Sequence, residues 1–183
     1  MKIVLGSTGT ATAVDLLAVV LAEEDVEKDT LLDEIDQSLD GALRRTIKDE
    51  DFTGKKDTTL ALLTLGRTAF RKLLLIGVGA AARAGAPELR AAAARAVKTA
   101  NADKSTSVAI ALRSKGEASE IRAAAEGAWL GAYRFTKYFT GDRKPKKEID
   151  RVVLGWRGAK DGAKAASDQK RALSQAEAVA AST

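Results

Sequence analysis

Two short apolar runs, separated by a turn, constrain the fold of this 183-residue chain more than any other feature. Residues 60–65 and 73–78 are rich in Leu, and the turn-like sequence Gly-Arg-Thr at 66–68 lies between them. The second run ends in Gly77-Val78-Gly79. Apolar runs of this length that are bounded by Gly are typical of buried strands. The segment therefore predicts two neighbouring strands of a sheet.

Further strands alternate with helices along the chain. Runs rich in Val, Ile and Leu predict strands at residues 1–6, 15–21, 107–112 and 149–155. Helices are predicted to open at Pro87, to span 117–133 and to span 159–181. Such alternation is typical of an α/β sandwich with a mixed, mostly parallel sheet.

One amphipathic helix is predicted between the second and third strands. Leu residues and Ile35 recur at spacings of three and four from Leu32 to Leu43, which places them on one helical face. Thr30 is the predicted N-cap, and basic residues at 44–48 suit the far end of the helix dipole.

The composition excludes several kinds of chemistry. The chain has no Cys and no His, which rules out disulfides, thiol and histidine catalysis, and nearly every zinc site. The apolar run at 16–22 is too short to span a membrane. Residues 1–25 could be read as a secretory leader, but Asp15 splits their apolar part, so two strands are favoured. We expect a cytoplasmic protein.

Carboxylates and glycines offer two weaker candidate sites. Gly77, Gly79 and Ala82 match a loose pyrophosphate-binding pattern, but the next predicted helix begins several residues too late, so a flexible turn is favoured. The rows Asp33-Asp36-Asp40 and Glu23-Glu24-Asp25 could hold a hard cation. A solvated helix face and a solvated loop are favoured for them. No catalytic, cofactor-binding or metal site is predicted in this chain.

The densest basic patch is the candidate anion-binding site. Residues 1–51 carry 5 basic and 13 acidic side chains, a net charge of −8, whereas residues 52–183 carry a net charge of +13. The patch lies on a predicted surface loop and the strand after it, and could neutralise several phosphates. A solubilising loop is the favoured alternative. Its residues are Arg143, Lys144, Lys146, Lys147 and Arg151.

Several motifs together resemble the amino-terminal domain of the leucyl (cytosol) aminopeptidase family. The resemblance spans about residues 1–180 and is strongest at 40–79 and 125–140. The most specific motif is Gly-Ala-Tyr-Arg-Phe at 131–135; Asp-Phe-Thr-Gly-Lys at 51–55 and the strand ends at 65–66 and 75–79 also match. One departure is Leu63, where the family often has Pro.

The resemblance implies a three-layer, macro-domain-like fold over residues 1–158 and a connector helix over 159–183. It also implies a second, catalytic domain whose Lys, Asp and Glu side chains hold two divalent metals, zinc or manganese. No position of this chain matches those ligand motifs, and we expect the chain to end before that domain. In the family, the amino-terminal domain helps to build a hexamer, and in some bacterial members it contributes to DNA binding.

Two functions follow from this reasoning. The first is an inactive accessory domain of a leucyl-aminopeptidase-type metallo-exopeptidase, which serves oligomer assembly and active-site access. Its partners would be copies of itself or the missing catalytic domain, with no membrane partner. The alternative is a polyanion-binding module, which would bind DNA through the basic patch or an ADP-ribose-like nucleotide near Gly77 and Gly79.

Overall fold

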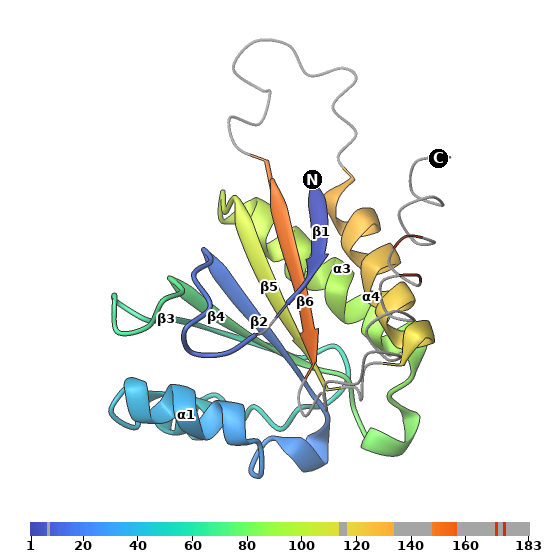
Figure 1. Cartoon of the computed structure of the whole chain (residues 1–183). Coiled ribbons are helices and arrows are strands. Elements are labelled where there is room, and N and C mark those ends of the chain that lie inside the picture. The colour runs from blue at the N-terminus through green and yellow to red at the C-terminus, as the bar shows by residue number, and fades with distance from the viewer. Residues whose placement is uncertain (7, 114–116, 134–147, 157–170, 172–173, 175–183) are drawn as a thin grey trace.

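A six-stranded sheet forms the centre of the computed structural model (Figure 1). The structure describes residues 1–6, 8–113, 117–133, 148–156, 171 and 174. The strand order is β1-β6-β5-β2-β4-β3, in which β3 runs antiparallel to β4 and all other neighbours are parallel. The predicted mixed, mostly parallel sheet is confirmed. Its strands are β1 (Lys2–Leu5), β2 (Leu16–Leu21), β3 (Thr59–Leu63), β4 (Lys72–Gly77), β5 (Ser107–Leu112) and β6 (Arg151–Trp156).

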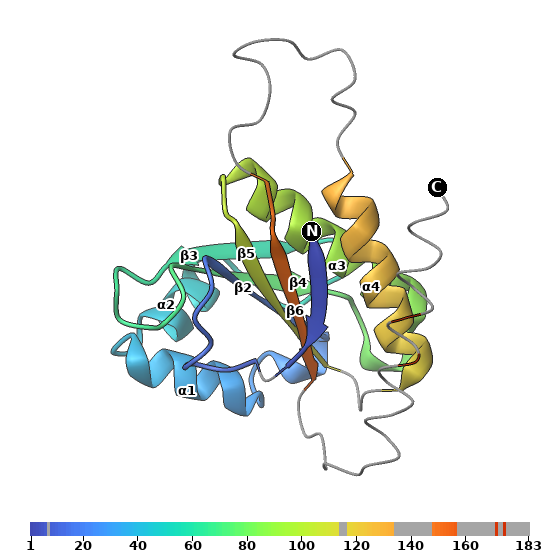
Figure 2. The same ribbon diagram turned by 45° about the horizontal axis from the view of Figure 1, so that its top comes forward.

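Helices cover both faces of the sheet, which gives three layers. Helices α1 (Thr30–Ser38) and α2 (Ala42–Asp49) lie on one face, and α3 (Ala86–Ala102) and α4 (Ala118–Ala132) on the other (Figures 1 and 2). Strand β2 shows why: Leu16, Ala18 and Val20 join the core under α3 and α4, and the alternate residues join the core under α1 and α2. Both faces of β2 are thus apolar, as expected for a strand buried between two helical layers.

Small residues let α3 and α4 pack very closely. A Cβ atom at Gly127 would lie 2.0 Å from the carbonyl oxygen of Arg90, and one at Gly131 would lie 2.5 Å from that of Ala94. The helix opening near Pro87 and the helix at 117–133 are confirmed to within one residue. The Ala bias of the sequence is therefore explained by this contact, where larger side chains would hold the backbones apart.

The single helix predicted from Thr30 to residue 48 is wrong, because the segment forms two helices. Asp40 and Gly41 have φ values of 53° and 76°, which no α-helix accommodates, and they separate α1 from α2. The N-cap is Asp29 instead of Thr30: its carboxylate accepts from the amides of Leu31 at 2.9 Å and Leu32 at 3.2 Å.

The predicted strand at 60–65 is two residues too long at its end. Strand β3 stops at Leu63, and Leu65 has a φ of 52° with 85% of its surface exposed. The turn is closed by Thr64, whose hydroxyl donates to the Phe70 carbonyl at 2.5 Å and whose amide donates to the Arg71 carbonyl at 3.1 Å. These bonds take the place of further strand pairing.

Parts of the sequence prediction lie outside the described residues. They include the loop at 140–147, the last two residues (134–135) of the Gly-Ala-Tyr-Arg-Phe motif, and nearly all of the connector helix predicted at 159–183. Among the residues that the structure does describe, no helix is both long enough and apolar enough to cross a lipid bilayer.

Candidate functional site

The carboxyl ends of the parallel strands are the natural place for a ligand in an α/β sheet. Strands β2, β4 and β5 end there side by side, and each is followed by a different polar segment. The short helical turn η1 (Glu23–Asp25) follows β2, the turn η2 (Ala81–Arg83) comes soon after β4, and Arg113 follows β5.

Acidic side chains of η1 bind the neighbouring segments at this edge. Asp25 accepts from the Arg113 guanidinium at 2.7 Å and from the Ala22 amide at 3.3 Å. Glu24 accepts from the Ala81 amide at 2.9 Å, and this bond holds the pKa of the Glu24 carboxyl below its ordinary value. The acidic turn thus ties together the ends of three strands.

The glycine pattern after β4 is part of the same internal framework. The amides of Gly77, Val78 and Gly79 donate to the carbonyls of residues 58, 21 and 54 at 2.9, 2.9 and 3.0 Å. A Cβ atom at Gly77 would lie 2.2 Å from the Lys55 carbonyl oxygen, so Gly is required there by the neighbouring backbone. These three amides already donate to backbone carbonyls and do not form a pyrophosphate-binding loop, so the interpretation of the segment as a turn is favoured.

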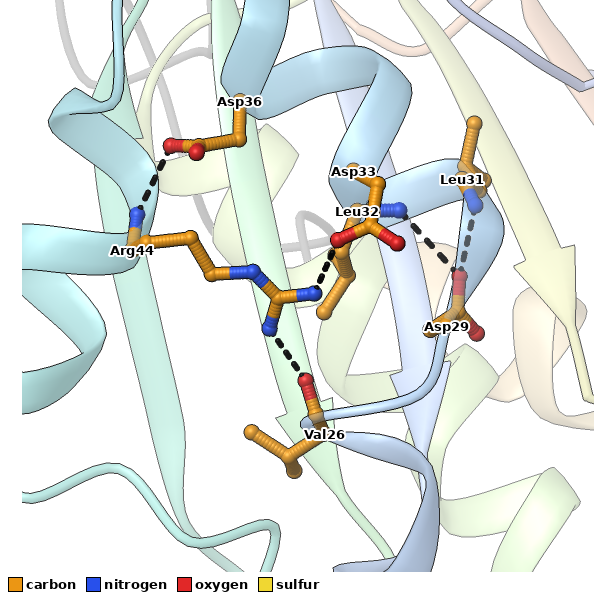
Figure 3. A network of polar contacts seen from close by, with 7 residues as sticks. All are labelled: Val26, Asp29, Leu31, Leu32, Asp33, Asp36 and Arg44. Atoms are coloured by element: carbon orange, nitrogen blue, oxygen red, sulfur yellow. Dashed lines mark hydrogen bonds and ion pairs between the residues drawn. The ribbon is translucent and has the colours of Figure 1, made fainter.

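The predicted acidic row at 33–40 is structural as well. Arg44 of α2 donates to the Val26 carbonyl and to Asp33, each at 2.5 Å, and its own amide donates to Asp36 at 2.9 Å (Figure 3). Asp40 forms an ion pair with Arg67. Within the described residues there is no group of three or more Asp or Glu side chains that could hold a metal ion.

A groove of about 620 Å³ lies between the acidic turn and α2. Its charged lining is mixed in sign, with Glu23 and Glu27 near Lys28 and Lys48, and Phe52 supplies an apolar patch. The lining therefore has no single charge sign that would favour an anion or a cation.

The basic patch is only partly visible. Arg151 begins β6, with an exposed side chain, and pairs in register with Lys2 and Ser107 on its two sides. Residues 143, 144, 146 and 147 lie outside the described residues, so the anion-binding site stays a prediction.

Sequence reasoning missed the pairs that join distant segments. Arg113 and Asp25 are separated by 88 positions, and Arg90 reaches Glu126 across 36 positions, at 2.6 Å. Bonds from Arg122 and Arg90 hold the pKa of the Glu126 carboxyl below its ordinary value. No local pattern marks such pairs, because each partner looks like an ordinary surface charge.

The strand order and the two helical layers define an α/β domain of macrodomain type. A macrodomain of Oceanobacillus iheyensis superposes with a TM-score of 0.59 over 94% of this chain and 86% of that one, at 12% identity. At such low identity the likeness shows the fold alone.

The family is given by the sequence comparison. The model of the cytosol aminopeptidase family, N-terminal domain, matches residues 18–141. The chain therefore belongs to the cytosol aminopeptidase family, through the N-terminal domain of that family. A probable cytosol aminopeptidase of Alkaliphilus oremlandii is 34% identical over 127 residues, and one of Syntrophotalea carbinolica is 28% identical over 188 residues.

The chain spans only a fraction of these relatives. The alignments cover 67% of this chain and 26% of the Alkaliphilus protein, and 98% of this chain and 38% of the Syntrophotalea protein. A mutant of tomato leucine aminopeptidase superposes with a TM-score of 0.76 at 25% identity, over 98% of this chain and 36% of that one. The resemblance proposed from the motifs is thus confirmed for family and fold.

Proposed function

We propose that this chain is the non-catalytic amino-terminal domain of a leucyl-aminopeptidase-type metallo-exopeptidase, and that it serves oligomer assembly and active-site access. The observation that carries the proposal is the extent of the match: the family's N-terminal domain fits residues 18–141, while the chain spans 26% and 38% of two full-length relatives. Removal of amino acids from the N-termini of peptides would be the activity of the complete enzyme.

The side chains of the described residues support a scaffold role. The charged groups at the carboxyl edge bind other parts of the same domain, which leaves them to hold the sheet ends together. In our proposal, the two divalent metals, zinc or manganese, would be held by Lys, Asp and Glu side chains of the catalytic domain. Residues 159–183 would connect the domains, and the enzyme would act in the cytoplasm.

Hydrolysis of a leucyl amide tests the proposal directly. The purified chain, supplied with manganese or zinc, is expected to show no turnover, whereas a full-length relative under the same conditions provides the positive control. Turnover that stays with the chain through successive purification steps, and that a chelator abolishes, would overturn the proposal.

The polyanion-binding alternative remains a prediction. It rests on the net charge of +13 over residues 52–183, and Arg151 is the one member of the patch whose exposed side chain is described. Titration of labelled duplex DNA at two salt concentrations tests it, since phosphate contacts weaken steeply as salt rises. A thermal shift with ADP-ribose tests nucleotide binding, which must raise the stability of the folded state. Absence of both effects at low salt would remove this alternative.

A further inference from the structure

Strand β3 lies at the outer end of the sheet, so among the described residues no strand neighbours one of its two sides (Figure 1). The amide of Thr64 donates to the Arg71 carbonyl, and Thr58 accepts from the Gly77 amide. In an antiparallel pair, the backbone N–H and C=O groups of successive residues point alternately toward the partner strand and away from it. Since even-numbered residues face β4, the N–H and C=O groups of Thr59, Ala61 and Leu63 point toward the free side.

This edge lacks the features by which sheets usually prevent association. No charged residue and no Pro occurs between positions 58 and 66, and the register with β4 is continuous from Thr59 to Leu63. The side chains of Thr59 and Ala61 are exposed, and that of Leu63 is 59% exposed. By contrast, the other edge strand, β1, has only four residues and begins with an exposed Lys2. Edges blunted by short length and Lys are the common protected kind.

We propose that the free edge of β3 pairs antiparallel with β3 of a second copy of this chain, about a twofold axis at Ala61. This register sets Ala61 opposite Ala61 and Thr59 opposite Leu63, so every outward-facing residue meets another. All three pairs are uncharged, and no unpaired charge is brought into the interface. A twofold contact also uses the same edge on both copies and closes the assembly there, so no further chain can add at β3.

Pairing at β3 would provide one of the contacts for the assembly role proposed above, and it rests on that proposal because it requires the domain to associate with itself. A strand pair by itself buries less than the ~1,200–2,000 Å² of a stable interface. The isolated domain is therefore expected to form a reversible, concentration-dependent dimer, which other contacts of the complete enzyme would strengthen.

Cysteine cross-linking tests the register, because the chain has no Cys of its own. Directly opposed residues of a hydrogen-bonded antiparallel pair have Cα atoms about 5.5 Å apart. This separation lies within the ~4.4–6.8 Å of natural disulfides. Under mild oxidation, Ala61→Cys is expected to become a covalent dimer. Ala91→Cys, at an exposed position of α3, is the matched control and is expected to remain mostly monomeric.

Sedimentation velocity over a concentration series tests the association. The unmodified chain is expected to move from monomer to dimer, and Ala61→Lys is expected to remain monomeric because it places two like charges at the axis. Ala61→Pro should act alike, since it removes an outward N–H and leaves the β4 pairing intact. Leu130→Lys, on the exposed surface of α4, is the control that should associate normally.

The outcomes separate the inference from the proposed function. If the unmodified chain dimerises and Ala61→Lys dimerises equally, the β3 pairing is wrong and assembly uses another surface. If the unmodified chain is monomeric at every concentration and Ala61→Cys does not cross-link, both the pairing and self-assembly by this domain are wrong. Circular dichroism of each variant establishes that the fold is retained.

Discussion

Asp15, which directly precedes β2, joins the beginnings of three strands through its carboxylate and its backbone. Its carboxylate accepts from the Thr106 amide at 2.7 Å, from the Thr106 hydroxyl at 2.9 Å and from the Ser107 amide at 3.3 Å. Its backbone carbonyl accepts from the Lys72 amide at 3.1 Å. The hydrogen bond from the Thr106 amide, more than the other contacts, lowers the pKa of Asp15. Asp15, which interrupts an apolar run in the sequence, thus connects neighbouring strands of the sheet.

Asp15→Asn is expected to destabilise the fold by about 1–3 kcal/mol at neutral pH, because the charged acceptor is lost. Since the folded-state pKa lies below the unfolded value, the contribution of Asp15 is present above the unfolded pKa and disappears as pH falls through the folded one. Urea unfolding at pH 7 and at a pH below 3.8, the ordinary pKa of an Asp carboxyl, measures this change in stability. The difference between variant and parent should shrink in acid; a difference independent of pH would contradict the assignment.

The contact between α3 and α4 depends on the absence of a side chain at Gly127. Gly127→Ala would place a methyl group 2.0 Å from the Arg90 carbonyl oxygen, so the helices must separate. Overpacking of this kind costs about 1–3 kcal/mol, which thermal or urea unfolding detects. Gly9→Ala is the control, because a Cβ atom there has no neighbour within 4 Å. Equal stabilities of the two variants would show that the helices are not in this contact.

Helices α1 and α2 and the loop before them are joined by Arg44, whose side chain is only 26% exposed. Arg44→Met keeps most of the apolar stem but removes the bonds to Val26 and Asp33. We expect a loss of about 1–3 kcal/mol in the free energy of unfolding. Arg45→Met, at the exposed neighbouring position, should change it by less than ~0.5 kcal/mol. If both variants have the same effect, the network contributes nothing specific.

Periodicity was sufficient to predict most elements but not their breaks. Strand β5 has the predicted bounds, and α4 differs by one residue at each end. The break at Asp40 was hidden because the apolar spacing from Leu32 to Leu43 continues through it, so one face pattern covers two helices. The end of β3 was hidden for a similar reason, since Leu65 looks apolar in sequence but lies exposed after the strand.

The whole fold was predictable because its motifs are structural, whereas the contacts at the sheet edge were not. Buried strands appear in the sequence as apolar runs, and the closely packed helices appear as Ala-rich segments. The carboxyl edge is held by Asp25 with Arg113 and by Glu24 with Ala81, which only the folded chain brings together. From the sequence, the acidic turn at 23–25 was interpreted as a solvated loop or a cation site, whereas in the structure it holds the strand ends together.

The proposed accessory role is tested most directly by joining this chain to the catalytic domain of a relative with measured aminopeptidase activity. Molecular mass and leucyl-amide turnover are then measured for the fusion, for the catalytic domain alone and for the intact relative. An accessory assembly domain predicts that the fusion forms a larger assembly and turns over faster than the catalytic domain alone. A folded, metal-loaded fusion with the mass and rate of the catalytic domain alone would contradict a role of this domain in assembly and active-site access.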